Sequence, residues 1–120
     1  MEEKLFPLKL YLKHRINLVL FVLAIIINLV SFCWLAYYIR PQEEQIFLHY
    51  NALFGVDLIG SWYKIYYLPV SGLLIIIVNT ILGWILYRKS KSIGYIAGGI
   101  SVFLQIIIFI ASYLLVLLNV

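Results

Sequence analysis

Three long apolar runs that carry no charged residue constrain the fold more than any other feature. They are Ile16–Ile39, Ile65–Tyr87 and Ile93–Leu118, with 24, 23 and 26 residues. An α-helix rises about 1.5 Å per residue, so about 20 residues cross a hydrocarbon core of ~30 Å. In lipid, a helix is the open-ended segment that satisfies its own backbone hydrogen bonds. The runs therefore predict an all-α membrane protein with three transmembrane helices.

The composition excludes the soluble classes of protein. Of the 120 residues, 65% are hydrophobic and 12% are charged, whereas a soluble domain is about half apolar and about a quarter charged. A water-soluble domain, a disordered segment and a nucleic-acid-binding arm are all excluded by this balance. We therefore expect the lipid bilayer as a partner and no nucleic acid.

The basic residues are distributed unequally among the segments that flank the runs. Seven of the nine Lys and Arg lie in residues 1–15 and 88–92, while the connection at residues 40–64 holds two basic residues and three acids. Cytoplasmic segments of membrane proteins are enriched in Lys and Arg. We predict a multi-pass protein of the cell membrane with a cytoplasmic N terminus, an outer loop at residues 40–64 and an extracytoplasmic C terminus.

The chain is predicted to form a single membrane domain. Residues 1–15 form a basic juxtamembrane segment, in which Pro7 suits the first position of a short helix lying on lipid headgroups. Residues 88–92 form a cytoplasmic turn between the second and third spans. Tryptophans and tyrosines near the ends of the runs are typical of side chains at the membrane interface.

Small and amide side chains within the runs predict where the helices pack. Gly94 and Gly98 lie four residues apart, a spacing that lets two helices approach closely, either within the chain or between copies of it. Each run also carries one deep amide, and we predict that the three form an interhelical hydrogen-bonded cluster worth ~0.6 kcal/mol per bond. These amides are Asn28, Asn79 and Gln105. A path for protons or solutes is the alternative, but the runs lack the ionisable side chains that such paths use.

The outer loop at residues 40–64 is too apolar for a solvated linker, so it must bury its side chains against the helix ends, the interface or a partner. We predict a small hairpin-like cap over the outer helix ends, with one strand in residues 45–50 and a second in residues 56–59. Asn51 and Gly55 supply turn residues between them, and Gly60 ends the second strand.

Two titratable side chains in this loop, His49 and Asp57, are spaced to face each other across a hairpin. The pair either fixes the loop by hydrogen bonds, with Asn51 bonding nearby backbone, or forms part of a ligand or metal site. Two ligands are fewer than a zinc site needs. No metal-binding, nucleophilic or phosphate-binding motif occurs in the sequence. We expect no enzyme activity, no cofactor and no metal.

The loop resembles a bacterial membrane domain of unknown function that also forms the N-terminal part of the Sdp-toxin immunity protein. That loop reads P-x-x-I-P-x-H-x-N-x-x-G-x-x-D-x-x-G before a helix with an early proline, here Pro69. Glu43, Phe47 and Phe54 replace its prolines and its first glycine, whereas the matching positions are Ile46, His49, Asn51, Asp57 and Gly60. The loop is also similar to those of small three-helix membrane proteins of reduced-genome bacteria, which read Y-N-x-x-F-G-V-D-x-x-G. Both resemblances imply a bacterial inner-membrane protein.

Two hypotheses for the function follow. In the first, the ordered outer loop binds a peptide or protein partner in an immunity-like or sensor-like role, and the candidate site comprises His49, Asn51, Asp57 and Gly60. In the second, the chain is an accessory subunit or a homo-oligomeric structural protein of a membrane complex, and the stripe of Gly94 and Gly98 forms its contact.

A cysteine at position 45 tests the predicted topology. Because residues 40–64 are predicted to lie outside, Gln45→Cys in a Cys33→Ser background should react with a membrane-impermeant maleimide in intact cells. Labelling that appears only after lysis would reverse the predicted orientation.

Overall fold

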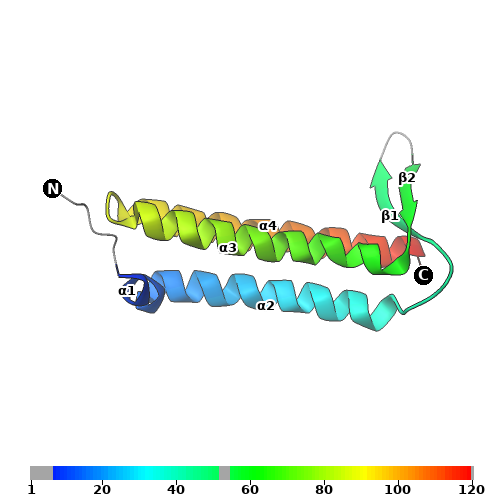
Figure 1. The fold of residues 1–120 in the computed structure, drawn as a ribbon, viewed down its shortest axis with the longest axis horizontal. Coiled ribbons are helices and arrows are strands. Elements are labelled where there is room, and N and C mark those ends of the chain that lie inside the picture. The colour runs from blue at the N-terminus through cyan, green and yellow to red at the C-terminus, as the bar shows by residue number, and fades with distance from the viewer. Residues whose placement is uncertain (1–6, 52–54, 120) are drawn as a thin grey trace.

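Three long helices lie side by side along the longest axis of the molecule (Figure 1). The computed structural model describes residues 7–51 and 55–119, except for the side chains of Leu8 and of residues 49–51 and 55–58. The long helices are α2 (Arg15–Tyr38), α3 (Tyr67–Tyr87) and α4 (Lys91–Asn119). A short helix, α1 (Leu8–Lys13), lies at one end of the bundle. A two-stranded antiparallel hairpin of β1 (Ile46–Asn51) and β2 (Gly55–Gly60) lies at the other.

All three long helices are apolar enough and long enough to cross a membrane. The candidate spans are Arg15–Tyr38, Trp62–Tyr87 and Lys91–Asn119, the second of which includes the 3-10 turn η1 (Trp62–Tyr66) before α3. The prediction of an all-α protein with three membrane-spanning helices is therefore confirmed. The observed spans begin one to three residues before the predicted ones and end within one residue of them.

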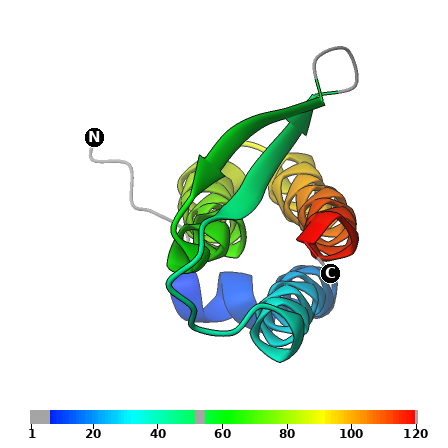
Figure 2. The same ribbon diagram turned by 90° about the vertical axis from the view of Figure 1, so that its right-hand side faces the viewer.

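Helix α4 makes the most extensive packing contacts in the bundle. It packs along both α2 and α3, which contact each other less. Viewed along the helices, the three lie at the corners of a triangle (Figure 2). The buried face of α4 carries small and polar groups, including Ser101, Gln105 and Ser112. Side chains of this kind let helix backbones approach closely in lipid, where apolar residues gain little by leaving the hydrocarbon.

The glycine stripe of α4 packs inside the chain. A Cβ atom added at Gly98 would lie 2.9 Å from Leu20 Cδ1 and 3.0 Å from Leu20 Cβ of α2. One added at Gly94 would lie 2.7 Å from the ring of Tyr87. The neighbouring Gly99 has no such atom within 4 Å. The close contact that the spacing predicts is therefore made between helices of one chain.

Helix α1 does not lie only on a lipid surface as predicted, because it inserts a tyrosine into the bundle. Tyr11 is 4% exposed, and its ring lies edge-on to that of Tyr87, with the centroids 4.9 Å apart. The chain can turn back here because His14 has an extended backbone, with ψ at 129°, between α1 and α2. Burial, and then the neighbouring Tyr87, raise the pKa of the Tyr11 hydroxyl above its ordinary value.

A matched pair of glycine variants tests the role of the stripe. We expect Gly98→Ile to lower the free energy of unfolding by about 1–3 kcal/mol, because the new side chain would overpack the contact with Leu20. Gly99→Ile should change it by less than about 0.5 kcal/mol, since that position is open. Reversible unfolding in mixed micelles measures both. A Gly98→Ile protein that keeps its stability but changes its oligomeric size would place the stripe between chains instead.

Candidate functional site

The hairpin is rooted in a buried apolar cluster at the end of the bundle where α2 and α4 end and η1 leads into α3. From the hairpin side the cluster contains Ile46, which is 5% exposed, and from η1 it contains Ile65, which is 2% exposed. The Tyr66 hydroxyl also donates a hydrogen bond of 3.3 Å to the carbonyl oxygen of Ile39, tying η1 to the end of α2. The remaining buried members are Leu35, Ile39, Leu115 and Val116. The root of the hairpin is therefore part of the core.

One amide side chain fastens the hairpin to α4. Asn119 Oδ1 accepts a hydrogen bond of 2.7 Å from the backbone N–H of Phe47, and Asn119 Nδ2 donates one of 2.8 Å to the Phe47 carbonyl oxygen. The side chain thus occupies the place of a neighbouring strand on the outer edge of β1. Because the backbone groups of Phe47 point outward, those of its cross-strand partner Ile59 point to the outer edge of β2.

The strand register places the predicted loop residues but does not pair them directly. His49 lies opposite Leu58 and Asn51 lies opposite Gly55. Two register shifts leave Leu48 and Asp57 without a partner of their own, which is the pattern of β-bulges. His49 and Asp57 are thus diagonal neighbours in the backbone. The side chains of His49, Asn51 and Asp57 lie outside the described residues, so their predicted hydrogen bonds stay a prediction.

Gly60 lies at the root of the hairpin, opposite Ile46. A Cβ atom there would lie 2.7 Å from Leu48 Cδ1 and 3.3 Å from Lys64 Cδ. A side chain at this position would therefore displace Leu48, which packs against the buried cluster. Packing thus accounts for the glycine that the sequence analysis assigned to the candidate site.

A groove of about 1010 Å³ lies between the hairpin and the adjoining ends of α3 and α4. Its walls are formed mainly by leucine and other apolar side chains of the two helices, including Leu68, Leu114 and Leu117, and Leu48 and Ile59 of the hairpin also line it. Among the described residues that line it, the charged one is Lys64. The groove is thus a mostly apolar surface with one cation and the hydroxyl side chains of Tyr67 and Ser71.

A polar junction joins the three long helices deep in the bundle. Asn28 Nδ2 donates to the Pro69 carbonyl oxygen at 2.8 Å and to Gln105 Oε1 at 3.0 Å. Gln105 Nε2 donates to the Gly72 carbonyl oxygen at 2.9 Å. Both amides are almost fully buried. A Cβ at Gly72 would lie 2.7 Å from Gln105 Oε1, so the glycine makes room for this junction.

Asn79 does not belong to this junction, although one cluster of three amides was predicted. Its Nδ2 donates instead to Ser101 Oγ of α4, at 3.0 Å. Asn79 lies seven residues beyond Gly72, which separates them by about 10 Å along a helix axis. An amide side chain cannot bridge that distance, so the bundle has two polar contacts at different depths.

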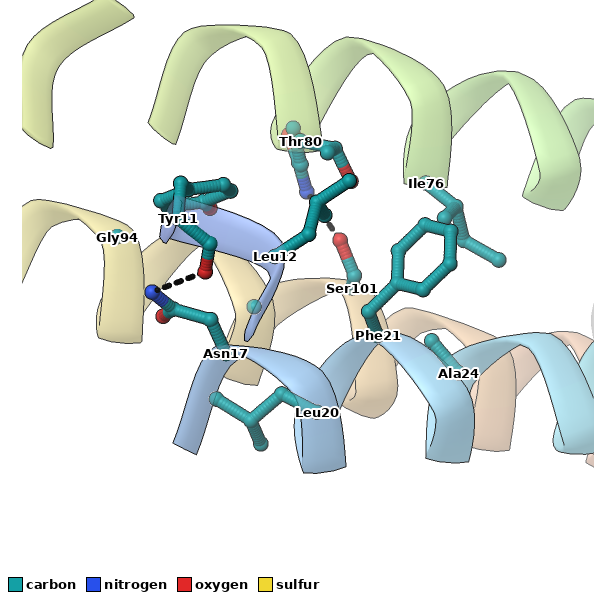
Figure 3. A pocket seen from close by; sticks show the side chains of 12 residues that line it. Tyr11, Leu12, Asn17, Leu20, Phe21, Ala24, Ile76, Thr80, Gly94 and Ser101 are labelled. Carbon is teal, nitrogen blue, oxygen red and sulfur yellow. Dashed lines mark hydrogen bonds between the residues drawn. The ribbon is translucent and has the colours of Figure 1, made fainter. Parts of the chain in front are cut away.

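A small cavity lies near α1, where the labelled side chains of Figure 3 converge. It offers about 10 Å³ to the centre of a water-sized molecule, which is close to the space that one water needs. The Asn17 side chain is 5% exposed, and its Nδ2 donates a hydrogen bond of 3.1 Å to the Tyr11 carbonyl oxygen. Its Oδ1 has no hydrogen-bond partner among the described residues. Asn79 and Ser101 also line the cavity. It is too small to admit a solute.

Among the side chains that the structure describes, which exclude those of residues 49–51 and 55–58, no three of His, Cys, Asp or Glu gather as a metal site would require. The residues that shape the hairpin end include one that the sequence analysis missed, Asn119. Its only signal is an amide directly after a long apolar run, and such a signal does not indicate a partner 72 residues away.

The fold defines a multi-pass membrane protein with a hairpin at one end of a three-helix bundle. No protein-family model, curated protein or solved structure matches the chain. The resemblance to the immunity-protein domain therefore stays a prediction.

A double-mutant cycle tests the buried junction. We expect Asn28→Leu and Gln105→Leu each to lower the free energy of unfolding by about 1–2 kcal/mol, because each leaves a buried polar group without its partner. The two should couple by about 0.6–1.7 kcal/mol. Asn79→Leu is the matched control, because it breaks a separate contact. Its change in the free energy of unfolding should add to that of Gln105→Leu without coupling. Equal coupling for both pairs would contradict two separate centres.

Proposed function

We propose that this chain is a small membrane protein whose hairpin end binds a peptide or protein partner on the extracytoplasmic side. The observation that carries the proposal is the shape of the hairpin, which is rooted in the core at Ile46 and extends sideways from the helices (Figure 1). A segment that served only to connect two helices would not need a fixed hairpin with an uncovered edge.

The outer edge of β2 supports a particular mode of binding. In the described chain the sheet has two strands, so β2 has one edge that no strand covers. Phe47 and Ile59 form a cross-strand pair and are 37% and 52% exposed. An extended peptide binds such an edge by main-chain hydrogen bonds and gains specificity from neighbouring side chains. An immunity-like or sensor-like role fits a protein that recognises its partner in this way.

The alternative, an accessory subunit or a homo-oligomer, has less support. It was motivated by the stripe of Gly94 and Gly98. The space beside these glycines is occupied by Tyr87 and Leu20 of the same chain. An assembly through other surfaces of the helices would need a different contact.

The geometry of β2 allows a test that spares the hairpin itself. The backbone N–H of Ile59 points to the uncovered edge, so Ile59→Pro removes an edge donor while leaving the β1–β2 hydrogen bonds in place. With a photo-crosslinking amino acid at the exposed Tyr63, the wild-type protein should give a discrete adduct in intact cells. Ile59→Pro should abolish the adduct, while Ile59→Val, which keeps the donor, should preserve it.

A triple substitution of His49, Asn51 and Asp57 by alanine tests the predicted site residues in the same assay. We expect loss of the adduct with unchanged thermal stability in micelles. Absence of any wild-type adduct, or an adduct that survives both Ile59→Pro and the triple substitution, would contradict the proposal.

A further inference from the structure

The hairpin overhangs one side of the bundle and leaves a sheltered space beneath it. Seen along the helices, β1 and β2 pass over the side of α3 and α4 that faces away from α2 (Figure 2). Because the strands run across the helix axis, a bundle that crosses a membrane would hold them along the membrane surface. The groove of about 1010 Å³ lies under this overhang.

The walls of the groove have the chemistry of a lipid site. Leu114 and Leu117 of α4 are 56% and 57% exposed there, and Leu48 and Ile59 close the groove from the hairpin side. These side chains offer hydrocarbon contact alone, and the hydroxyl of Ser71, which also lines the groove, is donated to the Leu68 carbonyl oxygen at 2.6 Å. An occupant must therefore be apolar along most of its length, at a depth where the surrounding solvent is lipid.

The charge at the rim of the groove indicates which polar group an occupant would carry. Lys64 of η1 is exposed and is the charged residue in the lining, which includes no carboxylate among the described residues. Next to it, Tyr67 is 62% exposed and lines the groove, as an amphipathic ring does at the headgroup level. An ammonium group at this level attracts an anionic headgroup.

We propose that the groove binds one phospholipid, with an acyl chain against α3 and α4 and an anionic headgroup at Lys64 beneath the hairpin. A lipid held in this way differs from the lipids that surround the rest of the bundle, because the overhang restricts its exit toward water. The site uses the Ile59 side chain of β2 as part of its wall, but it uses neither the outer backbone edge of that strand nor a protein partner.

Photo-crosslinking with purified protein tests the acyl-chain contact. The protein is reconstituted in phosphatidylcholine vesicles with a minor fraction of phosphatidylglycerol that carries a diazirine on its acyl chain, and adducts are mapped by mass spectrometry. Adducts should be enriched on the groove face of α4 over the exposed Leu29 and Val30 of α2. Leu114→Trp, which fills the groove, should reduce them, while Leu74→Trp on the exposed face of α3 should not.

The headgroup contact is tested by competition between lipids. Lys64→Gln should lower the preference for phosphatidylglycerol over phosphatidylcholine by about fivefold, since one interfacial cation has about that effect on an anionic lipid. Arg40→Gln, which removes an exposed cation outside the groove, should leave the preference unchanged. Equal adduct yields on the faces of α2 and α4, or an unchanged preference in Lys64→Gln, would each overturn the proposal.

Discussion

The hydrogen bonds of the Asn28–Gln105 junction fix the three helices relative to one another. In lipid, apolar side chains gain little by moving from hydrocarbon to a neighbouring helix, so close packing and hydrogen bonds must hold a bundle together. The junction supplies such bonds from α2 and α4 to two carbonyl oxygens of α3. It therefore sets both the rotation and the depth of each helix, and Gly72 permits it by leaving space for the amides.

The hairpin end depends on this alignment. Ile46 is buried against Leu35, Ile65 and Leu115, which belong to three different segments. It can be buried only if these segments place the three side chains at the same depth. Asn119 then reaches the backbone of Phe47 because the end of α4 lies beside the root of β1. A shift of one helix by a turn, about 5.4 Å, would separate these groups. The surface proposed for partner binding and the groove proposed for lipid therefore depend on a contact deep in the bundle.

The parts of the fold that follow from length and apolar content could be predicted from the sequence. The three spans follow from the length of each apolar run, and the hairpin follows from an apolar loop interrupted by Asn51 and Gly55. These two residues were predicted to form the turn, but they are the last and first residues of the two strands and pair with each other. The pairing of the polar side chains could not be predicted, because the presence of an amide in a helix does not indicate which polar group on a neighbouring helix lies opposite it. Asn79 bonds Ser101, and Asn28 bonds Gln105. The insertion of Tyr11 and the role of Asn119 depend on tertiary proximity. Within the candidate site, the sequence indicated the strands but neither the register shifts nor the groove.

The fastening of β1 by Asn119 has a consequence for the order in which the protein assembles. Phe47 and Asn119 are 72 residues apart, with two of the three spans between them. During synthesis the strands emerge before α3 and α4 exist, so the outer edge of β1 has no partner until the last turn of α4 is made. The hairpin can form early from local contacts, but its bonds to Asn119 can form only after α4 has been made. These bonds thus report that all three spans have been made.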